Sequence, residues 1–230
     1  MNSLIGKYIL CLSLCCASSL AQAGISLDRT RLIIKAGDTG MVTVQNQLDT
    51  KNAAPFLIQS TVTEYGKNTR PQQGKFFVSP PLFRLDPGGS MGVQVQMLSA
   101  AGLPTDRESV FAFRAKAIPQ APDASVKNYM AIIVTSGIKL FYRPEGLSGN
   151  ANDSYKAIRV TRQGDKLLVT NPTPYYVTFQ TLSIGGKNVP HGDMVPPLGS
   201  QTYTVPAGAT GKVSWQTIND YGGYSDVITR

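Results

Sequence analysis

Short runs in which apolar and polar residues alternate dominate the chain. The clearest are residues 41–45, 93–97 and 111–117. A period of two is typical of antiparallel strands with one face in water. No segment of ten or more residues shows a convincing apolar period of 3.6, so no helix is predicted. The pattern therefore predicts an all-β protein.

One run is apolar on both faces. Residues 130–134 read MAIIV. As a strand, the run has these residues on its two faces: Met130, Ile132 and Val134 on one, Ala131 and Ile133 on the other. It is either a central strand buried between layers or a strand that adds to another protein's sheet. Edge strands of the second kind are normally blunted, because they invite pairing with other chains.

Turn residues separate the predicted strands. They are Pro-Gly-Gly at 87–89 and Gly-Gly at 185–186 and 222–223. Many short strands without helices point to β-sandwiches. Further strands are expected near residues 166–170, 175–184, 201–205 and 212–218. A small, polar, Gly-containing stretch suggests two domains, with a first domain at residues 24–145, a linker at 146–154 and a second domain at 155–230.

The first 23 residues have the parts of a secretory signal peptide. Lys7 precedes an apolar stretch, residues 8–17, and Ala-Gln-Ala at 21–23 is a cleavage site. The apolar stretch is too short to span a bilayer. Cleavage after Ala23 removes all three cysteines, so the exported protein has no thiol, disulfide or cysteine metal site. It must therefore depend on buried cores.

The chain is basic, with a net charge of +8, or +7 once Lys7 is lost. A basic exported protein can attract nucleic acid, anionic lipid or an acidic protein. The basic residues are scattered in runs no longer than two, which argues against nucleic acid. Charge alone does not choose between the other partners.

The reactive groups disfavour an enzyme. His191 is the single histidine, and a serine nucleophile would need it as a base. The sequence has no G-x-S-x-G turn and no set of zinc ligands. Asp106 and Glu108 lie two apart in a polar loop, where capping or ion pairing is the simpler role. No catalytic residue, metal or cofactor is therefore predicted.

Six segments, in order along the mature chain, carry a resemblance to a known family. They are ISLDRTRLII (25–34), VSPPLFRLDPG (78–88), LPTDRESVF (103–111), IKLFYRP (138–144), NPTPYYVTF (171–179) and INDYGG (218–223). Each is modest evidence alone, but six at compatible spacings are specific. The chain resembles the periplasmic chaperones of the chaperone–usher pilus (fimbrial) assembly pathway. The short segment between Phe113 and Met130, without a cysteine pair, is similar to the family's short-loop branch.

The resemblance implies a fold and a function. The fold is all-β, with two immunoglobulin-like β-sandwich domains joined at an angle and a cleft between them. The protein would work in the periplasm, where it would bind, fold and cap pilus subunits that lack their last strand. It would lend them a strand of its own (donor-strand complementation) and deliver them to an outer-membrane usher. No nucleic acid, metal or cofactor is implied.

Two sets of site residues follow from the resemblance. The lent strand is residues 129–139, with Met130, Ile132 and Val134 in the subunit groove and Ala131 and Ile133 packed on the chaperone's own domain. Arg31 and Lys139 match the residues that hold the subunit's C-terminal carboxylate. That chemistry is sensible, since a buried carboxylate needs paired donors.

Two further sets match the family pattern. Glu108, Arg143 and Asp220 correspond to interdomain salt bridges that fix the angle between the domains. The apolar patch that contacts the usher would be Pro55, Leu57, Pro80, Pro81 and Leu82. Ser79–Pro80 is a candidate for a cis bond. Gln94 departs from the pattern, because many relatives carry a basic residue there, so usher recognition is expected to differ in detail.

Three alternatives stay open. A pilus subunit or adhesin is the closest, although subunits usually have one short domain and a cysteine pair. A carbohydrate-binding sandwich would expose clustered aromatic residues, whereas Trp215 is the single tryptophan. An enzyme is third. Self-association of the free protein, which would cap its own strand, also remains open.

Overall fold

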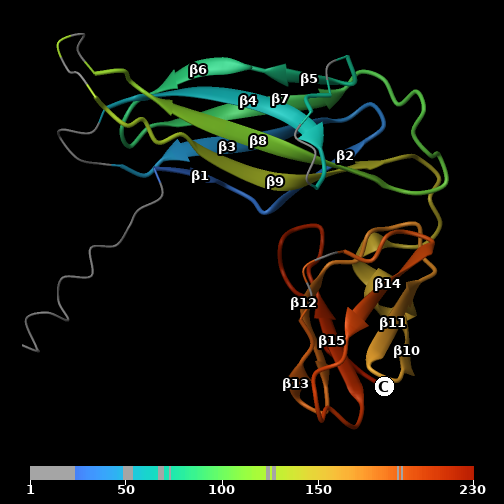
Figure 1. The fold of residues 1–230 in the computed structure, drawn as a ribbon. Coiled ribbons are helices and arrows are strands. Elements are labelled where there is room, and N and C mark those ends of the chain that lie inside the picture. Colours follow the sequence, from blue (N-terminus) through green and yellow to red (C-terminus); the bar gives the residue numbers. More distant parts are fainter. Residues whose placement is uncertain are drawn as a thin grey trace, which may run out of the picture.

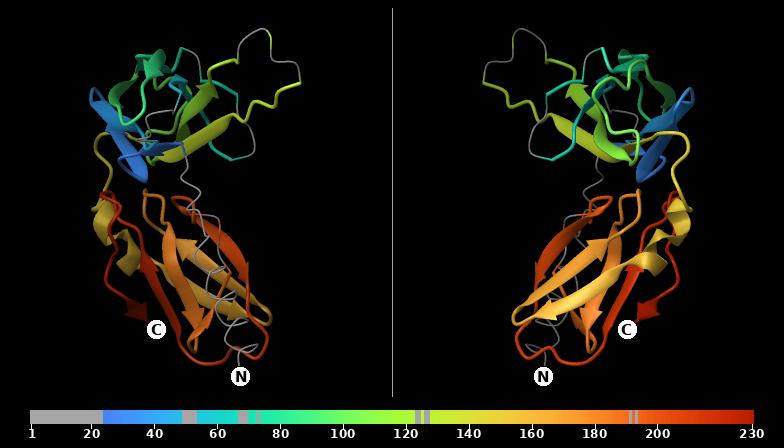
Figure 2. Two further views of the ribbon diagram at one scale, coloured as in Figure 1. Left: turned by 90° about the vertical axis from the view of Figure 1, so that its left-hand side faces the viewer. Right: turned by 90° about the vertical axis from the view of Figure 1, so that its right-hand side faces the viewer.

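The computed structural model describes residues 24–48, 54–66, 70–72, 74–122, 125, 128–190, 192 and 194–230. The predicted signal peptide and His191 lie outside these residues. The described chain forms two β-sandwiches joined at an angle (Figure 1), and Figure 2 gives two side views of the same arrangement. Within the described chain, no helix has the length and apolar character to cross a membrane.

The first sandwich consists of a four-stranded and a five-stranded sheet. The four-stranded sheet has the order β1 (Ile25–Leu27), β3 (Thr39–Asn46), β7 (Ser90–Met97) and β5 (Phe76–Ser79). The five-stranded sheet has the order β2 (Arg31–Lys35), β9 (Val134–Arg143), β8 (Ser109–Pro119), β4 (Phe56–Glu64) and β6 (Leu82–Leu85). Parallel pairing occurs between β2 and β9.

The core between these two sheets is formed by side chains at alternate positions along the strands. Buried positions two apart come from β3, β7 and β8: Val42 and Val44, Val93 and Val95, and Phe111, Phe113, Ala115 and Ala117. Phe76 packs edge-on against Phe111, with ring centroids 4.9 Å apart. The alternation expected for these three segments is confirmed.

The second sandwich is smaller. One sheet has the order β10 (Arg159–Gln163), β11 (Lys166–Asn171) and β14 (Gly199–Thr204), and the other β13 (Lys187–Asn188), β12 (Phe179–Ile184), β15 (Val213–Thr217) and β16 (Ile228–Thr229). Its core surrounds the fully buried Trp215. The indole Nε1–H donates to the carbonyl of Tyr155, 3.1 Å away, which satisfies the one polar atom of this side chain.

Two expectations for this half of the chain are wrong. Helical turns exist, as the 3-10 turn η1 (Ala151–Asp153) and α2 (Ser154–Ala157), with the Asn150 side chain accepting a bond from the amide of Asn152. Such short turns show no apolar period. The strand expected from residue 175 begins only at Phe179, because Asn171 donates to the carbonyl of Tyr175, 2.7 Å away, and holds a turn there.

Candidate functional site

Strand β9 is paired along one edge and half-paired along the other. Strand β8 pairs with it from Val134 to Tyr142. On its opposite edge β2 pairs only from Lys139 onward, where Arg31 and Lys139 are Cα partners. Within the described chain, no strand pairs with that edge from Val134 to Ile138. This stretch therefore has backbone groups available to another strand.

The apolar run continues beyond the strand into solvent. Met130 is 87% exposed and Ile132 is 70% exposed. The expectation that Ala131 and Ile133 pack on their own domain is wrong, since both are exposed. The ladder stops at the Ala117–Val134 pair, close to Pro119, which has no N–H to extend it. The free protein thus presents apolar side chains on both sides of this run.

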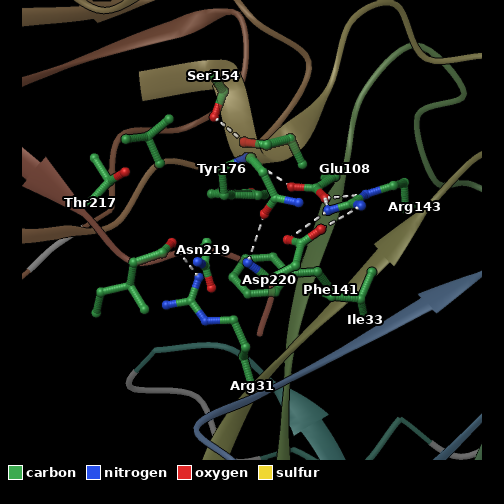
Figure 3. Close-up of a pocket in the computed structure, with 14 residues that line it drawn as sticks. Arg31, Ile33, Glu108, Phe141, Arg143, Ser154, Tyr176, Thr217, Asn219 and Asp220 are labelled. Atoms are coloured by element: carbon green, nitrogen blue, oxygen red, sulfur yellow. Dashed lines mark hydrogen bonds and ion pairs between the residues drawn. The ribbon is translucent and has the colours of Figure 1, made fainter. Parts of the chain in front are cut away.

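The two faces of the following segment of β9 have different roles. Ile138, Leu140 and Tyr142 are buried in the core of the first domain. Lys139, Phe141 and Arg143 point to the other face, by the period of the strand. Phe141 contacts Tyr176 of the second domain, with ring centroids 5.6 Å apart, so this face forms one wall of the interdomain cleft (Figure 3).

Arg31 lies almost completely buried in this cleft, with 8% of its surface exposed. Its Nη1 donates to the carbonyl of Ile218 in the second domain, 3.0 Å away, as Figure 3 shows. Its buried Nε has no hydrogen-bond partner. Burial lowers the pKa of Arg31, against the charges of Asp220 and Glu108. A buried cation with a spare donor is suited to an anionic ligand.

Lys139 lies beside Arg31 in the sheet, but its side chain borders a separate hollow. Arg31 lines the interdomain pocket, whereas Lys139 lines a hollow with Tyr65, Ala112 and Arg114. The Lys139 ammonium is 5.9 Å from the centroid of the Tyr65 ring. The two cations thus lie on neighbouring strands, at the point where β2 begins to pair with β9.

A buried ion-pair network joins the two domains through Arg143. Its Nε donates to Glu108 Oε1 at 2.8 Å, and its Nη1 and Nη2 donate to the two carboxylate oxygens of Asp220 at 2.8 and 3.0 Å. The guanidinium also lies 5.0 Å from the ring centroid of Tyr175. The structure therefore brings together the three residues matched to the interdomain salt bridges (Figure 3).

Burial controls the electrostatics of this network. Glu108 is 3% exposed and also accepts a bond from the amide of Tyr176, 2.8 Å away. Burial raises the pKa of the Glu108 carboxyl, and the charge of Arg143 opposes that shift. Burial alone would lower the pKa of Arg143, but hydrogen bonds to Asp220 and the charge of Glu108 outweigh it and raise that pKa.

Sequence reasoning missed four contributors to the cleft. They are Asn152, Tyr175, Tyr176 and Ile218. Both tyrosines lie inside the NPTPYYVTF segment, which was an available signal. Asn152, whose side chain accepts a bond from the amide of Asp220, lies in the stretch expected to be a plain linker. The role of Ile218 depends on its backbone carbonyl, which no residue type reveals.

The predicted usher patch lies on the first domain away from the cleft residues. Leu57 on β4 and Leu82 on β6 are both exposed. They lie on the same face of the sheet, because Leu82 is the Cα partner of Gln59, and Gln59 lies two residues from Leu57 on β4. Pro80 and Pro81 lie at the turn between β5 and β6, and the Ser79–Pro80 bond is cis, as expected. Gln94 is exposed and is the Cα partner of Ser79. Pro55 is half-buried next to β4.

Groups that could support catalysis at a metal do not gather in the described residues. No cluster of three or more His, Cys, Asp or Glu side chains occurs there. The carboxylates of the cleft are engaged with Arg143. The cleft is thus lined by two arginines and two carboxylates, of which Arg31 donates to a backbone carbonyl and Arg143 to the carboxylates.

Known proteins with a similar sequence or fold are fimbrial chaperones. "Probable fimbrial chaperone LpfB" of Escherichia coli O157:H7 is 37% identical over 97% of this chain and 96% of its own length. "Chaperone protein FimC" of Escherichia coli K12 is 35% identical, covering 91% of this chain and 85% of FimC. The structure of the Salmonella enterica SafA pilin in complex with the SafB chaperone matches with a TM-score of 0.80 and 29% identity, covering 92% of this chain and 98% of the matched one.

Both halves of the chain match family descriptions. Residues 24–148 match "Pili and flagellar-assembly chaperone, PapD N-terminal domain". Residues 153–229 match "Pili assembly chaperone PapD, C-terminal domain". Because both halves of the chain match these family descriptions and its two sandwiches match the solved chaperone fold, the chain belongs to the PapD-like family of pili assembly chaperones.

Proposed function

We propose that this protein is a periplasmic chaperone that binds, folds and caps pilus subunits by lending them a strand, and then delivers them to an outer-membrane usher. The observation that carries the proposal is the form of β9. An exposed apolar run leads into an unpaired strand edge, and that edge ends beside two cations, Arg31 and Lys139. An incomplete sandwich with an apolar groove would complement all three features.

The direction of the bound strand follows from the pairing. Strand β2 occupies the edge of β9 from Lys139 onward, so a strand that ends at Lys139 must approach from the side of Val134. It therefore runs parallel to β9. Met130, Ile132 and Val134 would enter the subunit's groove, where their exposed apolar surface would be buried.

The cations fix where that strand stops. The free carboxylate at the subunit's C-terminus would bind at Arg31 and Lys139, where Arg31 has a buried donor without a partner. A fixed end sets the register, and a slip by one residue would move every groove-facing side chain to the wrong face. The anchor and the apolar run therefore act together.

The remaining assignments are part of the same proposal. The Glu108–Arg143–Asp220 network would hold the angle between a first domain at residues 24–145 and a second at 155–230. The exposed Leu57 and Leu82 support a contact of the first domain with the usher. A signal peptide cleaved after Ala23 would bring the chain to the periplasm.

Co-purification tests this function. Tagged wild type and Lys139→Ala would be expressed in the periplasm of the native host, and their partners identified by mass spectrometry. Small subunits that bind wild type and are lost from Lys139→Ala support the proposal. Lys166→Ala, on β11 of the second domain, is the matched control and should keep the partners. Equal recovery with Lys139→Ala, or no subunit at all, would reject it.

A further inference from the structure

A turn of the second domain, residues 218–222, contacts the start of β2 at both of its ends. At the first end, the carbonyl of Ile218 accepts the bond from Arg31 Nη1 at 3.0 Å. At the other end, Gly222 lies so close to Thr30 that an added Cβ would be 3.0 Å from Thr30 Oγ1. The position of Arg31 is therefore linked to the position of this turn.

The 218–222 turn is held in place by bonds that do not involve Arg31. The side-chain oxygen of Asn219 accepts bonds from the amides of Tyr221 and Gly223, at 3.0 and 2.9 Å. The amide of Asp220 donates to the side-chain oxygen of Asn152 in η1, 3.1 Å away. The turn is thus fixed to its own domain, and the carbonyl that it offers to Arg31 is fixed with it.

Two neutral groups hold the Arg31 side chain. One is the carbonyl of Ile218, and the other is the ring of Phe141, whose centroid is 5.9 Å from Arg31 Cζ. The carboxylate of the turn, Asp220, directs both oxygens to Arg143, at 2.8 and 3.0 Å. Within the described residues, Arg31 has no ion-pair partner. Its orientation is therefore fixed while its charge stays available to an anion, as Figure 3 illustrates.

Holding a long side chain before its ligand arrives favours binding, because less side-chain freedom is lost when the complex forms. We propose that the 218–222 turn is a positioning element, which orients Arg31 for the C-terminal carboxylate of a bound subunit without neutralising it. The second domain thereby contributes to affinity through Arg31. This inference rests on the proposed function, which assigns that carboxylate to Arg31.

Peptide binding separates this role from stability. The probes are two N-acetylated peptides of about 16 residues, alternating Val and Thr, one with a free C-terminal carboxylate and one with a C-terminal amide. The ratio of their affinities isolates the bond to the carboxylate. Wild type should bind the acid about tenfold more tightly than the amide, as expected for a charge-assisted hydrogen bond. Arg31→Ala should remove most of this ratio.

Variants of the turn test the positioning role. Gly222→Ala should displace the turn from Thr30 and lower the ratio to about two- to threefold, with the affinity for the amide unchanged. Asn219→Ala, which removes two bonds inside the turn, should act in the same direction. Gly164→Ala is the matched control, because Gly164 has a φ of 63° but lies in the turn between β10 and β11. It should keep the wild-type ratio.

The outcomes distinguish the inference from the proposed function. Thermal melting would check that each variant is folded. A ratio near the wild-type value in both Gly222→Ala and Asn219→Ala would overturn the positioning role alone. Equal affinities of wild type for the acid and the amide would reject the carboxylate anchor, and the positioning role with it. Wild type that binds neither peptide would instead reject the strand-lending function.

Discussion

The two ends of one apolar stretch, residues 130–134 and Lys139–Arg143, differ in almost every physical respect. At the second end, β9 is paired on both edges, and its side chains are buried in the core or joined to the other domain. At the first end, apolar side chains stand in solvent beyond the last rung of the ladder. The contrast separates apolar residues that stabilise the fold from apolar residues that we propose bind a subunit.

The boundary between the two ends lies where β2 begins. The free edge of β9 ends at Lys139, which pairs with Arg31, the first residue of β2. Arg31 and Lys139 therefore lie at the transition from the open edge of β9 to the paired one. Changes at the closed end should affect folding, and changes at the open end should affect binding.

The largest effect on stability is expected at the closed end from Arg143→Ala. This change leaves Glu108 buried without its ion partner, and breaking a buried pair costs about 3–5 kcal/mol of unfolding free energy. Urea denaturation would measure it. Arg107→Ala, which breaks an exposed pair with Asp106, should cause no measurable loss. Equal stability of Arg143→Ala and wild type would contradict a structural role for the network.

A smaller effect on the unfolding free energy is expected from shortening an apolar side chain of this stretch. The size of the effect should depend on whether the residue lies at the paired or at the exposed end. Leu140→Ala removes a fully buried side chain and should cost about 2–5 kcal/mol of unfolding free energy. Ile132→Ala should change that free energy by no more than about 0.5 kcal/mol, because the side chain is mostly exposed. Subunit binding by Ile132→Ala should nevertheless weaken. If Ile132→Ala unfolded as readily as Leu140→Ala, residues 130–134 would belong to the core.

The smallest effect is expected between the two ends, at Gly137, and it should be stabilising. Gly137→Ala fits the local space and should raise the unfolding free energy by about 0.4–1 kcal/mol. Gly222→Ala is the contrasting control and should lower the unfolding free energy. Gly222 has a φ of 83°, and an added Cβ would lie 3.0 Å from Oγ1 of Thr30. Thermal melts of both variants would be compared. A loss of stability in Gly137→Ala would mean that glycine is needed there for folding.

Much of the fold could be predicted because burial in a strand follows the sequence with a period of two. Val42, Val44, Val93 and Val95 show this directly. The extent of β9 could not be predicted this way, since residues 130–133 carry the apolar pattern beyond the last pair between β8 and β9, Ala117–Val134. An apolar run shows that surface will be buried, but not whether the same chain buries it.

The candidate site was less accessible to sequence reasoning. Glu108 and Arg143 lie 35 residues apart, and Arg143 and Asp220 lie 77 apart, so no local period connects them. The family resemblance was what brought them together. The contact of Arg31 with the second domain was missed because it is made to the backbone carbonyl of Ile218. Arg31 on an alternating strand would otherwise be expected to point into solvent.

Amide hydrogen exchange of the free protein and of its complex with a co-purified subunit would test the central claim most directly. In the free protein, amides of residues 130–133 should exchange rapidly and those of Lys139–Arg143 slowly, because only the latter are in a two-sided ladder. In the complex, protection should appear over residues 130–138 and stay unchanged over Lys139–Arg143. A complex in which residues 130–138 gain no protection would contradict the account.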